Sequence, residues 1–184
     1  MKIKILIPVF NDFESVSKLL IDINSTLSNL NADFSVILVN DASTEKNDID
    51  DSNADKINSI KIINMKHNQG HARCIATGLK YIFDNEEFDY IIPMDGDGED
   101  RPQEISKFVE FFKYDDTKPI VGERIKRSEG LVFKISYTIH KLVTFIFTGH
   151  SIKFGNYTCL PKSTVEKLIN EKATLSSFSG ALTK

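Results

Sequence analysis

Two carboxylates, Asp95 and Asp97, stand at positions i and i+2 directly after a short apolar run. Side chains leaving a strand at this spacing point to one side, and the glycines that follow each of them allow a tight turn. Mg²⁺ or Mn²⁺ would relieve the repulsion between the two carboxylates and bridge them to substrate phosphates, with Glu99 as a further oxygen ligand. The alternative is a polar turn in which Asp100 caps a helix that begins at Pro102.

Polar residues also follow three other apolar runs, and Asn11 is the first of them. Asp41 follows the second run, where it would accept hydrogen bonds from a nucleobase imide or a ribose hydroxyl, or serve as a turn residue. Asn68 and Gly70 open a helix whose N-terminus favours an anion. Arg73 on that helix adds positive charge, although a solvated surface arginine is the alternative.

The elements that must position these residues are short apolar segments that alternate with helical patterns. Runs without period-2 alternation predict strands buried on both faces, at 3–9, 34–39, 60–65 and 89–94. Apolar residues at helical spacing predict helices over 13–30, 71–83 and from Pro102 onward, and Asn11 with Glu14 resembles a capping box. The pattern predicts an α/β domain around a mostly parallel sheet, whose ligands bind beyond the carboxyl ends of the strands.

Two further segments have a marked composition. Residues 42–56 are polar and acidic without the spacing of a calcium-binding EF-hand, which predicts a solvated loop. Residues 131–147 are the most apolar segment and predict a helix that either packs on the domain or lies in the membrane interface. No run of 18 uncharged apolar residues predicts a membrane span.

The composition excludes several classes of protein. The 184 residues carry 23 Lys and Arg against 26 Asp and Glu, so a net charge of −3 gives no reason to expect nucleic acid as a partner. Two cysteines, far apart and without metal-ligand spacing, indicate a reducing compartment. We therefore expect a cytoplasmic protein, with contact to the cytoplasmic face of the membrane left open by residues 131–147.

Four motifs occur in a specific order: IPVFND, VNDAS, NQGHARCIATGL and MDGDGEDRPQEI. Over about residues 3–170 this order resembles the family 2 glycosyltransferases, which have a GT-A, Rossmann-like fold. It is most similar to the polyprenyl-phosphate hexosyltransferase branch, which includes dolichol-phosphate mannose synthase-like enzymes. The segment from Asp95 to Pro102 follows the frame of that branch's metal motif, Asp-x-Asp-Leu-Gln-x-x-Pro. The resemblance implies a catalytic domain over 1–170 and a C-terminal tail over 171–184.

The resemblance also implies roles for individual residues. A nucleoside pocket would be lined by Pro8, Val9, Asn11 and Asp41. Asp95 would contact the sugar nucleotide, and Asp97 with Glu99 would help to hold the metal on the diphosphate. Arg124 and Arg127 match the arginines of a basic loop that faces the phosphates, and Asn156 matches a position that borders the acceptor site.

The implied reaction is inverting transfer of a hexose from a UDP- or GDP-linked sugar to a polyprenyl phosphate, assisted by a divalent metal. The metal, together with Arg124 or Arg127, would stabilise the departing diphosphate. Three departures from the family pattern matter, and the first is Glu99, which replaces the Gln of the metal motif, a conservative change for a hard cation. Asn40 replaces the first Asp of the usual Asp-Asp pair after the second strand, which leaves the identity of the nucleobase undefined. Asn156 stands where some relatives have an Asp, a candidate general base. An amide cannot take up the proton that a hydroxyl acceptor must lose. Asn156 therefore favours a phosphate acceptor, whose second pKa of about 6 leaves it already anionic at neutral pH.

Several alternatives stay open. The acceptor could be a sugar hydroxyl in cell-surface polysaccharide synthesis, or the chain could bind a nucleotide sugar without turnover. A pyrophosphorylase or a dehydrogenase is disfavoured, because no glycine-rich phosphate loop follows the first strand. Relatives continue into an acceptor loop and membrane helices, so we expect that a chain ending at Lys184 is either a fragment or a protein that uses a membrane-anchored partner.

Overall fold

The computed structural model describes residues 1–27, 30–46, 48–112, 117–123 and 154–183. These residues form a six-stranded sheet in the order β3-β2-β1-β4-β6-β5. Neighbouring strands pair in parallel from β3 to β4, whereas β6 pairs antiparallel with both β4 and β5. The strands are β1 (Lys2–Val9), β2 (Asp33–Asn40), β3 (Ser59–Asn64), β4 (Tyr90–Pro93), β5 (Ile120–Glu123) and β6 (Phe154–Pro161).

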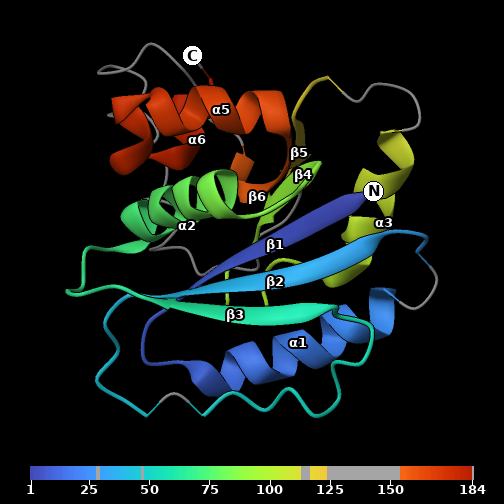
Figure 1. Cartoon of the computed structure of the whole chain (residues 1–184), viewed down its shortest axis with the longest axis vertical. Helices are drawn as coiled ribbons and strands as arrows, with labels where there is room; N and C mark the ends of the chain where they lie inside the picture. The colour runs from blue at the N-terminus through green and yellow to red at the C-terminus, as the bar shows by residue number, and fades with distance from the viewer. Residues whose placement is uncertain (28–29, 47, 113–116, 124–153, 184) are drawn as a thin grey trace, which may run out of the picture.

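Helices cover both faces of the sheet (Figure 1). One face carries α1 (Phe13–Leu27) and α3 (Ile105–Phe111), which follows the 3₁₀ helix η1 (Pro102–Glu104). The other face carries α2 (His71–Asn85), α5 (Lys162–Asn170) and α6 (Phe178–Leu182). Strand alternation explains the two cores, because Ile5 and Ile7 of β1 pack in the first core while Leu6 between them packs in the second. Burial on both faces accounts for the continuous apolar runs of β1, β2 and β4. The same prediction was wrong for residues 60–65, because β3 lies at the edge of the sheet and its residues are half-buried or exposed.

The predicted α/β class with a mostly parallel sheet is confirmed. Differences lie at the helix boundaries. Asn11 does not cap α1: the Asp12 carboxylate accepts the Ser15 N–H at 3.3 Å, because α1 begins one residue later than a cap at Asn11 requires. The N-cap position of η1 is Arg101, whose side chain makes no cap hydrogen bond, and Oδ2 of Asp100 accepts the Asp95 N–H at 2.9 Å. Strands β5 and β6 were not predicted. The basic loop, expected over residues 121–127, begins within β5, which ends at Glu123.

The reversed direction of β6 determines which residues meet at the sheet edge. Ile91 of β4 pairs with Leu160 of β6, and the same register continued along both strands places Asn156 opposite Asp95. The start of β6 therefore lies at the carboxyl end of β4. Long-range pairing of this kind joins residues separated by a large stretch of sequence.

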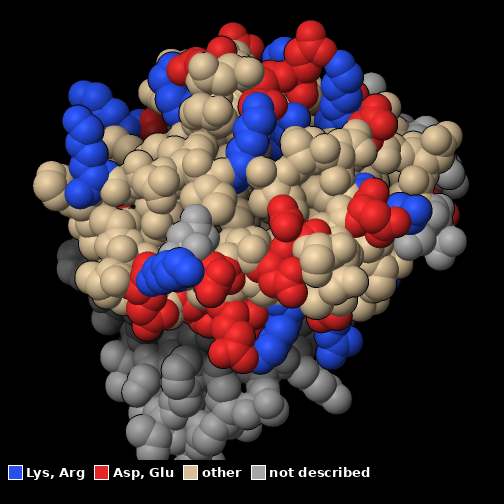
Figure 2. Space-filling view, turned by 60° about the horizontal axis from the view of Figure 1, so that its bottom comes forward, with Lys and Arg blue, Asp and Glu red and all other residues tan. Residues whose placement is uncertain are grey.

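The segment after β2 is exposed and acidic, as predicted for residues 42–56. Figure 2 shows carboxylates gathered on the face that carries α1 and this segment. Its own apolar residues Ala54 and Ile57 are buried and fix it to the first core. At the other end of the chain, a 3₁₀ helix η2 (Lys172–Leu175) leads into α6, whose Phe178 is only 2% exposed. The domain boundary at residue 170 stays a prediction.

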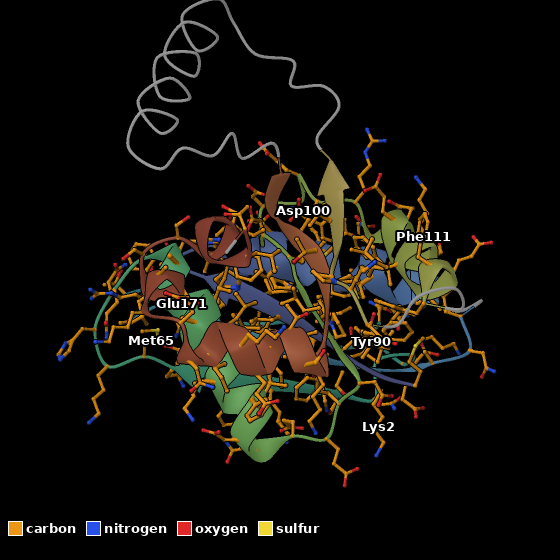
Figure 3. The ribbon with its side chains drawn as sticks, turned by 90° about the horizontal axis from the view of Figure 1, so that it is seen from above. Lys2, Met65, Tyr90, Asp100, Phe111 and Glu171 are labelled. Atoms are coloured by element: carbon orange, nitrogen blue, oxygen red, sulfur yellow. The ribbon has the colours of Figure 1, made fainter. Side chains whose placement is uncertain are left out.

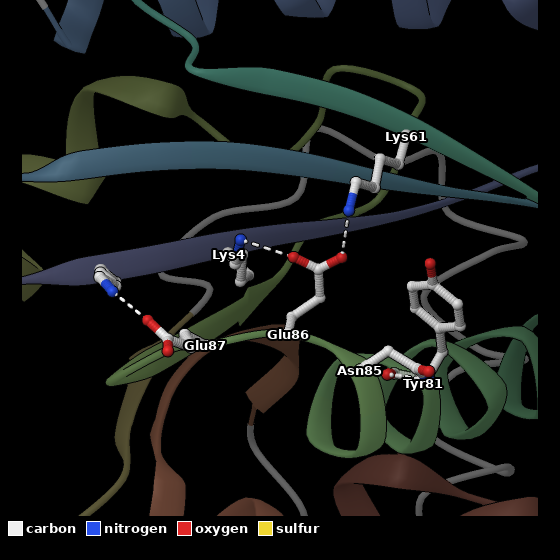
Figure 4. A network of polar contacts seen from close by, with 7 residues as sticks. Lys4, Lys61, Tyr81, Asn85, Glu86 and Glu87 are labelled. Atoms are coloured by element: carbon white, nitrogen blue, oxygen red, sulfur yellow. Dashed lines mark hydrogen bonds and ion pairs between the residues drawn. The ribbon is translucent and has the colours of Figure 1, made fainter.

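A buried charge network joins β1, β3 and the end of α2 (Figure 4). The Glu86 carboxylate accepts from Nζ of Lys4 at 3.0 Å and from Nζ of Lys61 at 2.5 Å. The Lys4 and Glu86 side chains are 10% and 9% exposed. The neighbouring pair of Lys2 and Glu87 is exposed, so these adjacent glutamates differ mainly in burial.

Among the described residues, no helix is long and apolar enough to cross a membrane. Residues 131–147, predicted as a helix on the domain or in the membrane interface, lie outside the described residues, and so do Arg124 and Arg127.

Candidate active site

A pocket of about 320 Å³ opens at the carboxyl edge of the parallel strands. In Figure 3, Asp100 marks this edge of the molecule, and Lys2 with Tyr90 marks the opposite edge. The pocket lies where α/β sheets bind ligands. Its lining comes from β1 and the turn after it, from α1, from the start of α2, from the turn after β4 and from β6, and consists of Pro8, Val9, Phe10, Asp12, Val16, His71, Asp95, Gly96, Asp97 and Asn156.

Asp95 is held from three directions. Its backbone N–H donates to Asp100 Oδ2 at 2.9 Å, which fixes the turn after β4. Its side-chain oxygen Oδ1 lies 3.2 Å from Nε2 of His71 and accepts from Nδ2 of Asn156 at 3.3 Å. The side chain is 20% exposed and lines the pocket. A carboxylate in this position can contact a ligand while its orientation stays fixed.

Asp97 and Glu99 lie further out in the same turn. Asp97 lines the pocket, and its Oδ1 accepts the Glu99 N–H at 2.9 Å, whereas Glu99 does not line the pocket. The described residues contain no group of three or more acidic, His or Cys side chains placed to enclose a metal ion. Asp95 and Asp97 instead fit an ion such as Mg²⁺, which commonly takes one or two carboxylates and completes its coordination with substrate phosphates and water.

His71 is a site residue that the sequence reasoning missed. It is the first residue of α2, its side chain is 46% exposed, and Asn156 Nδ2 lies 2.8 Å from its Nε2. The hydrogen bond to Asp95 raises the pKa of His71 above its ordinary value, burial opposes this, and the charges of Asp95, Asp97 and Asp100 add to it. Its position directly after Gly70, at a strand-to-helix connection, was the available signal.

Asp41 does not line the pocket. It is 4% exposed, and its two carboxylate oxygens accept the N–H groups of Gln69 and Gly70, each at 2.8 Å. Gly70 has φ +86°, which L side chains rarely adopt, and no side chain caps the helix that follows. Asp41 thus fixes the connection from β3 to α2. Its predicted contact with the nucleoside stays a prediction.

Asn11 joins the turns after β1 and β2. Its N–H donates to Ser43 Oγ at 2.9 Å, and its Oδ1 accepts the Thr44 and Glu45 N–H groups at 2.8 and 3.2 Å. Asn11 and Ala42 both have positive φ, at 51° and 56°. Their strained conformations at adjacent strand ends are typical of functional sites. Asn11 borders the site through these contacts without lining the pocket.

The predicted residues therefore separate into groups. The pocket brings together Pro8, Val9, Asp95, Asp97 and Asn156. Asn68 and Arg73 are exposed outside it, and the Arg73 guanidinium donates to Gln69 Oε1 at 3.3 Å. Phe10, which had no predicted role, lines the pocket and is 48% exposed.

Curated proteins provide the first comparison. The chain is 24% identical over 173 residues to the undecaprenyl-phosphate 4-deoxy-4-formamido-L-arabinose transferase of Enterobacter sp. (strain 638), and 26% identical over 175 residues to the Proteus mirabilis (strain HI4320) protein of the same name. Each match covers 92% of this chain and 50% of the relative. The chain thus spans about half the length of these relatives.

Solved structures share the fold at low sequence identity. S. aureus TarS 1-349 has a TM-score of 0.61 and 15% identity, over 99% of this chain and 55% of TarS. Glucosyl-3-phosphoglycerate synthase from Mycobacterium tuberculosis, solved with Mn²⁺, UDP-glucose and phosphoglyceric acid, has a TM-score of 0.60 and 11% identity, over 88% and 57% of the two chains.

The GT-A fold expected from the sequence is confirmed by these neighbours. The profile described as "Glycosyl transferase family 2" matches residues 4–172, which include most of β1, every described element from α1 to α5 and all residues of the pocket. The chain belongs to glycosyl transferase family 2.

Proposed function

We propose that this chain carries the catalytic domain of a metal-assisted, inverting glycosyltransferase that moves a sugar from a nucleoside diphosphate to a polyprenyl phosphate. The observation that carries the proposal is the pocket at the sheet edge, which exposes Asp95 and Asp97 beside the uncharged amide of Asn156. Two carboxylates suit a metal ion on the donor diphosphate, and an uncharged amide does not repel an anionic acceptor.

Asp95 and Asp97 would hold Mg²⁺ or Mn²⁺ on the diphosphate, where the ion would supply charge stabilisation for the leaving group. The related fold with bound Mn²⁺ and UDP-glucose supports this choice. Complexes of S. aureus TarS with UDP-GlcNAc, at a TM-score of 0.55, and with UDP support a UDP-linked donor as the first to test. Arg124 and Arg127, which face the phosphates in the family pattern, are proposed as further partners of the diphosphate.

The acceptor oxygen would form a bond to the anomeric carbon while the bond from that carbon to the diphosphate oxygen breaks. A phosphate oxygen with a second pKa of about 6 is already deprotonated at neutral pH and needs no base. The uncharged amide of Asn156 does not repel such an oxygen, whereas a carboxylate at this position would. The undecaprenyl-phosphate transferases that resemble this chain support a lipid phosphate as acceptor.

A lipid acceptor places the reaction at a membrane surface. We propose the cytoplasmic face, where nucleotide sugars are available, with residues 131–147 as the peripheral contact or a membrane-anchored partner in their place. The segment combines many apolar and aromatic residues with lysines, a composition that suits the membrane interface.

A sugar hydroxyl is the second candidate acceptor, and one observation favours it. The imidazole of His71 lines the pocket 3.2 Å from Asp95, where it could take the proton that a hydroxyl must lose.

The test measures release of nucleoside diphosphate from UDP- and GDP-hexoses, with undecaprenyl phosphate or a glycan as acceptor, using Asn156→Asp. The added carboxylate would repel a phosphate acceptor, so we expect turnover with undecaprenyl phosphate to fall at least about tenfold. Asn170→Asp makes the same chemical change on the exposed end of α5 and should leave turnover unchanged. Transfer only to a hydroxyl, improved by Asn156→Asp, would contradict the proposed acceptor.

A further inference from the structure

Strand β6 contacts the turn of residues 95–101 at both of its ends. Nδ2 of Asn156 donates to Oδ1 of Asp95, the first residue of this turn, at 3.3 Å. The hydroxyl of the next residue of β6, Tyr157, donates to the backbone carbonyl oxygen of Arg101 at 2.8 Å. Consecutive side chains of a strand point to opposite sides, so one lines the pocket while the other packs in the first core. The turn that carries the proposed metal ligands is therefore attached to β6 at its start and at its end.

Within the turn, the closest contacts are made by its first two residues. The Asp95 N–H donates to the Asp100 carboxylate at 2.9 Å, so the start of the turn is bonded to its next-to-last residue. A Cβ at Gly96 would lie 3.3 Å from a backbone oxygen of β1, which shows how closely this residue packs. A Cβ at Gly98, whose φ is +78°, would meet no atom within 4 Å. Gly98 adds no such packing next to Asp97, so the position of Asp97 depends on the two ends of the turn.

Tyr157 is suited to hold the far end of the turn. It is 5% exposed, and its ring packs edge-on against Phe108 of α3 at a centroid distance of 5.1 Å. Burial raises the pKa of its hydroxyl above the ordinary value, so the group keeps its proton and donates. The carbonyl oxygen of Arg101 also accepts the Glu104 N–H at 3.0 Å. The hydroxyl can therefore be removed while the ring packing and the first turn of η1 are kept.

We propose that the Tyr157 hydroxyl is a positioning group for the metal site, which fixes Arg101 and so holds the turn in the conformation that presents Asp95 and Asp97 to the pocket. Tyr157 does not line the pocket, so it acts through the turn and not by contact with the metal or the sugar nucleotide. The inference rests on the proposed function, in which Asp95 and Asp97 hold the metal on the diphosphate.

Tyr157→Phe removes this hydrogen bond and keeps the ring. The turn then spends less of its time in the conformation that binds the metal, and the apparent affinity falls by the same factor. One hydrogen bond corresponds to about fivefold, so the Mn²⁺ concentration for half-maximal turnover should rise about fivefold. At saturating Mn²⁺, kcat should return to within about twofold of the wild-type value. An unchanged Mn²⁺ dependence, or a loss of kcat that Mn²⁺ does not restore, would overturn the proposal.

Tyr81→Phe is the matched control. Tyr81 lies on α2 outside the pocket, near the buried charge network shown in Figure 4. The variant removes a tyrosine hydroxyl just as Tyr157→Phe does, but at a distance from the turn of residues 95–101. It should leave both the Mn²⁺ dependence and kcat unchanged. An equal shift of the Mn²⁺ dependence in both variants would contradict a specific role of Tyr157.

Hydrogen exchange tests the positioning role without metal or turnover. The Asp95 N–H is bonded to Asp100, so its exchange, measured by NMR in the metal-free protein, reports how often the turn opens. Tyr157→Phe should speed this exchange about fivefold relative to the amides of β2, and Tyr81→Phe should not. Asp100→Ala removes the acceptor itself and gives the rate of the unbonded amide for comparison. Equal Asp95 exchange in the wild type and Tyr157→Phe would overturn the proposal even in an active enzyme.

The two measurements also distinguish this inference from the proposed function. Faster Asp95 exchange in Tyr157→Phe, in a protein whose wild type transfers no sugar, would retain the positioning role and reject the proposed function. Sugar transfer by the wild type, together with unchanged exchange in Tyr157→Phe, would retain the proposed function and reject the positioning role.

Discussion

Oδ1 of Asp95 lies 3.2 Å from Nε2 of His71, although Asp95 follows the parallel strand β4 and His71 begins α2, the helix that precedes this strand in the sequence. Asn156, from the reversed strand β6, contacts both side chains. A carboxylate, an imidazole and an amide from three parts of the fold therefore meet in the lining of the pocket.

The Asp95 contact makes the charge of His71 depend on its neighbours. The hydrogen bond to Asp95 is the largest cause of the raised pKa of His71, and burial works against it. Asp95→Asn removes the charged acceptor, so the pKa of His71 should fall. An NMR titration of the His71 imidazole measures this shift. The same pKa in wild type and Asp95→Asn would contradict the contact.

The sign of the pH effect on stability follows from this raised pKa. Protonated His71 is favoured by the folded state, so its contribution is fully present below the ordinary value of 6.5 and is lost as the pH rises through the folded value. Unfolding by denaturant at pH 5.5 and pH 8.5 should show a larger effect of Asp95→Asn at the lower pH. An equal effect at both values would contradict the assignment.

The metal prediction concerns Asp97. Asp97→Ala removes one of the two carboxylates proposed to hold the metal, so Mn²⁺-dependent turnover should fall by at least about 100-fold, equivalent to about 2.7 kcal/mol. Glu99→Gln is the matched control from the same turn; Glu99 does not line the pocket, so its loss should cost less than about fivefold. Rates are compared over a Mn²⁺ titration. Wild-type turnover in Asp97→Ala would remove this residue from the site.

Glu86 and Glu87, which precede β4, form ion pairs that differ mainly in burial, so their variants show how much burial adds to the stability that an ion pair contributes. Glu86→Gln leaves Lys4 buried without its charged partner, and breaking a buried pair costs about 3–5 kcal/mol, with the lower end expected because Lys61 is half exposed. Glu87→Gln removes an exposed pair and should leave the denaturant midpoint unchanged. Equal midpoints for the two variants would contradict the buried network.

The pH dependence of the Glu86 network has the opposite sign to that of His71. Hydrogen bonding to Lys61 lowers the pKa of Glu86, burial opposes this, and Lys4 lowers the pKa further. The stabilisation is therefore present above the ordinary value of 4.5 and is lost as the pH falls through the folded value. The difference in stability between wild type and Glu86→Gln should shrink on acidification to pH 3.

Gly78 allows α2 to approach the sheet. An added Cβ would lie 2.2 Å from Cδ1 of the fully buried Leu6 and 3.0 Å from Cγ2 of Val39. Overpacking costs about 1–3 kcal/mol, which exceeds the gain in helix propensity of about 1 kcal/mol, so Gly78→Ala should destabilise the domain. Combining it with Leu6→Val should recover part of the loss. A more stable Gly78→Ala variant in chemical denaturation would contradict this packing.

The sequence predicts the first half of the fold well because its elements are local. Strands β1 to β4 appear as apolar runs, and α1 and α2 as stripes at helical spacing. Strand β6 was missed because its pairing with β4 joins distant segments, and FGNYTCLP has polar and glycine residues that are typical of a loop. Local patterns carry no information on such pairing.

The site was predicted only in part, because some of its contacts follow from local patterns and others from long-range pairing. Asp95 and Asp97 follow a recognisable strand, so their place at the sheet edge could be inferred. His71 was missed because one histidine after a glycine has many possible environments, and only the register between β4 and β6 brings Asn156 next to it. Likewise, the role of Asp41 in holding Gly70 depends on the conformation of the connection to α2.

The central claim is that Asp95 and Asp97 bind a nucleoside diphosphate through a divalent metal. Calorimetric titration of the protein with UDP and with GDP, each with Mn²⁺ and with chelator, tests it most directly. We predict binding of one nucleotide that weakens at least about tenfold, or about 1.4 kcal/mol, when the metal is removed. Equal affinity with Mn²⁺ and with chelator, or binding of neither nucleotide, would contradict the account.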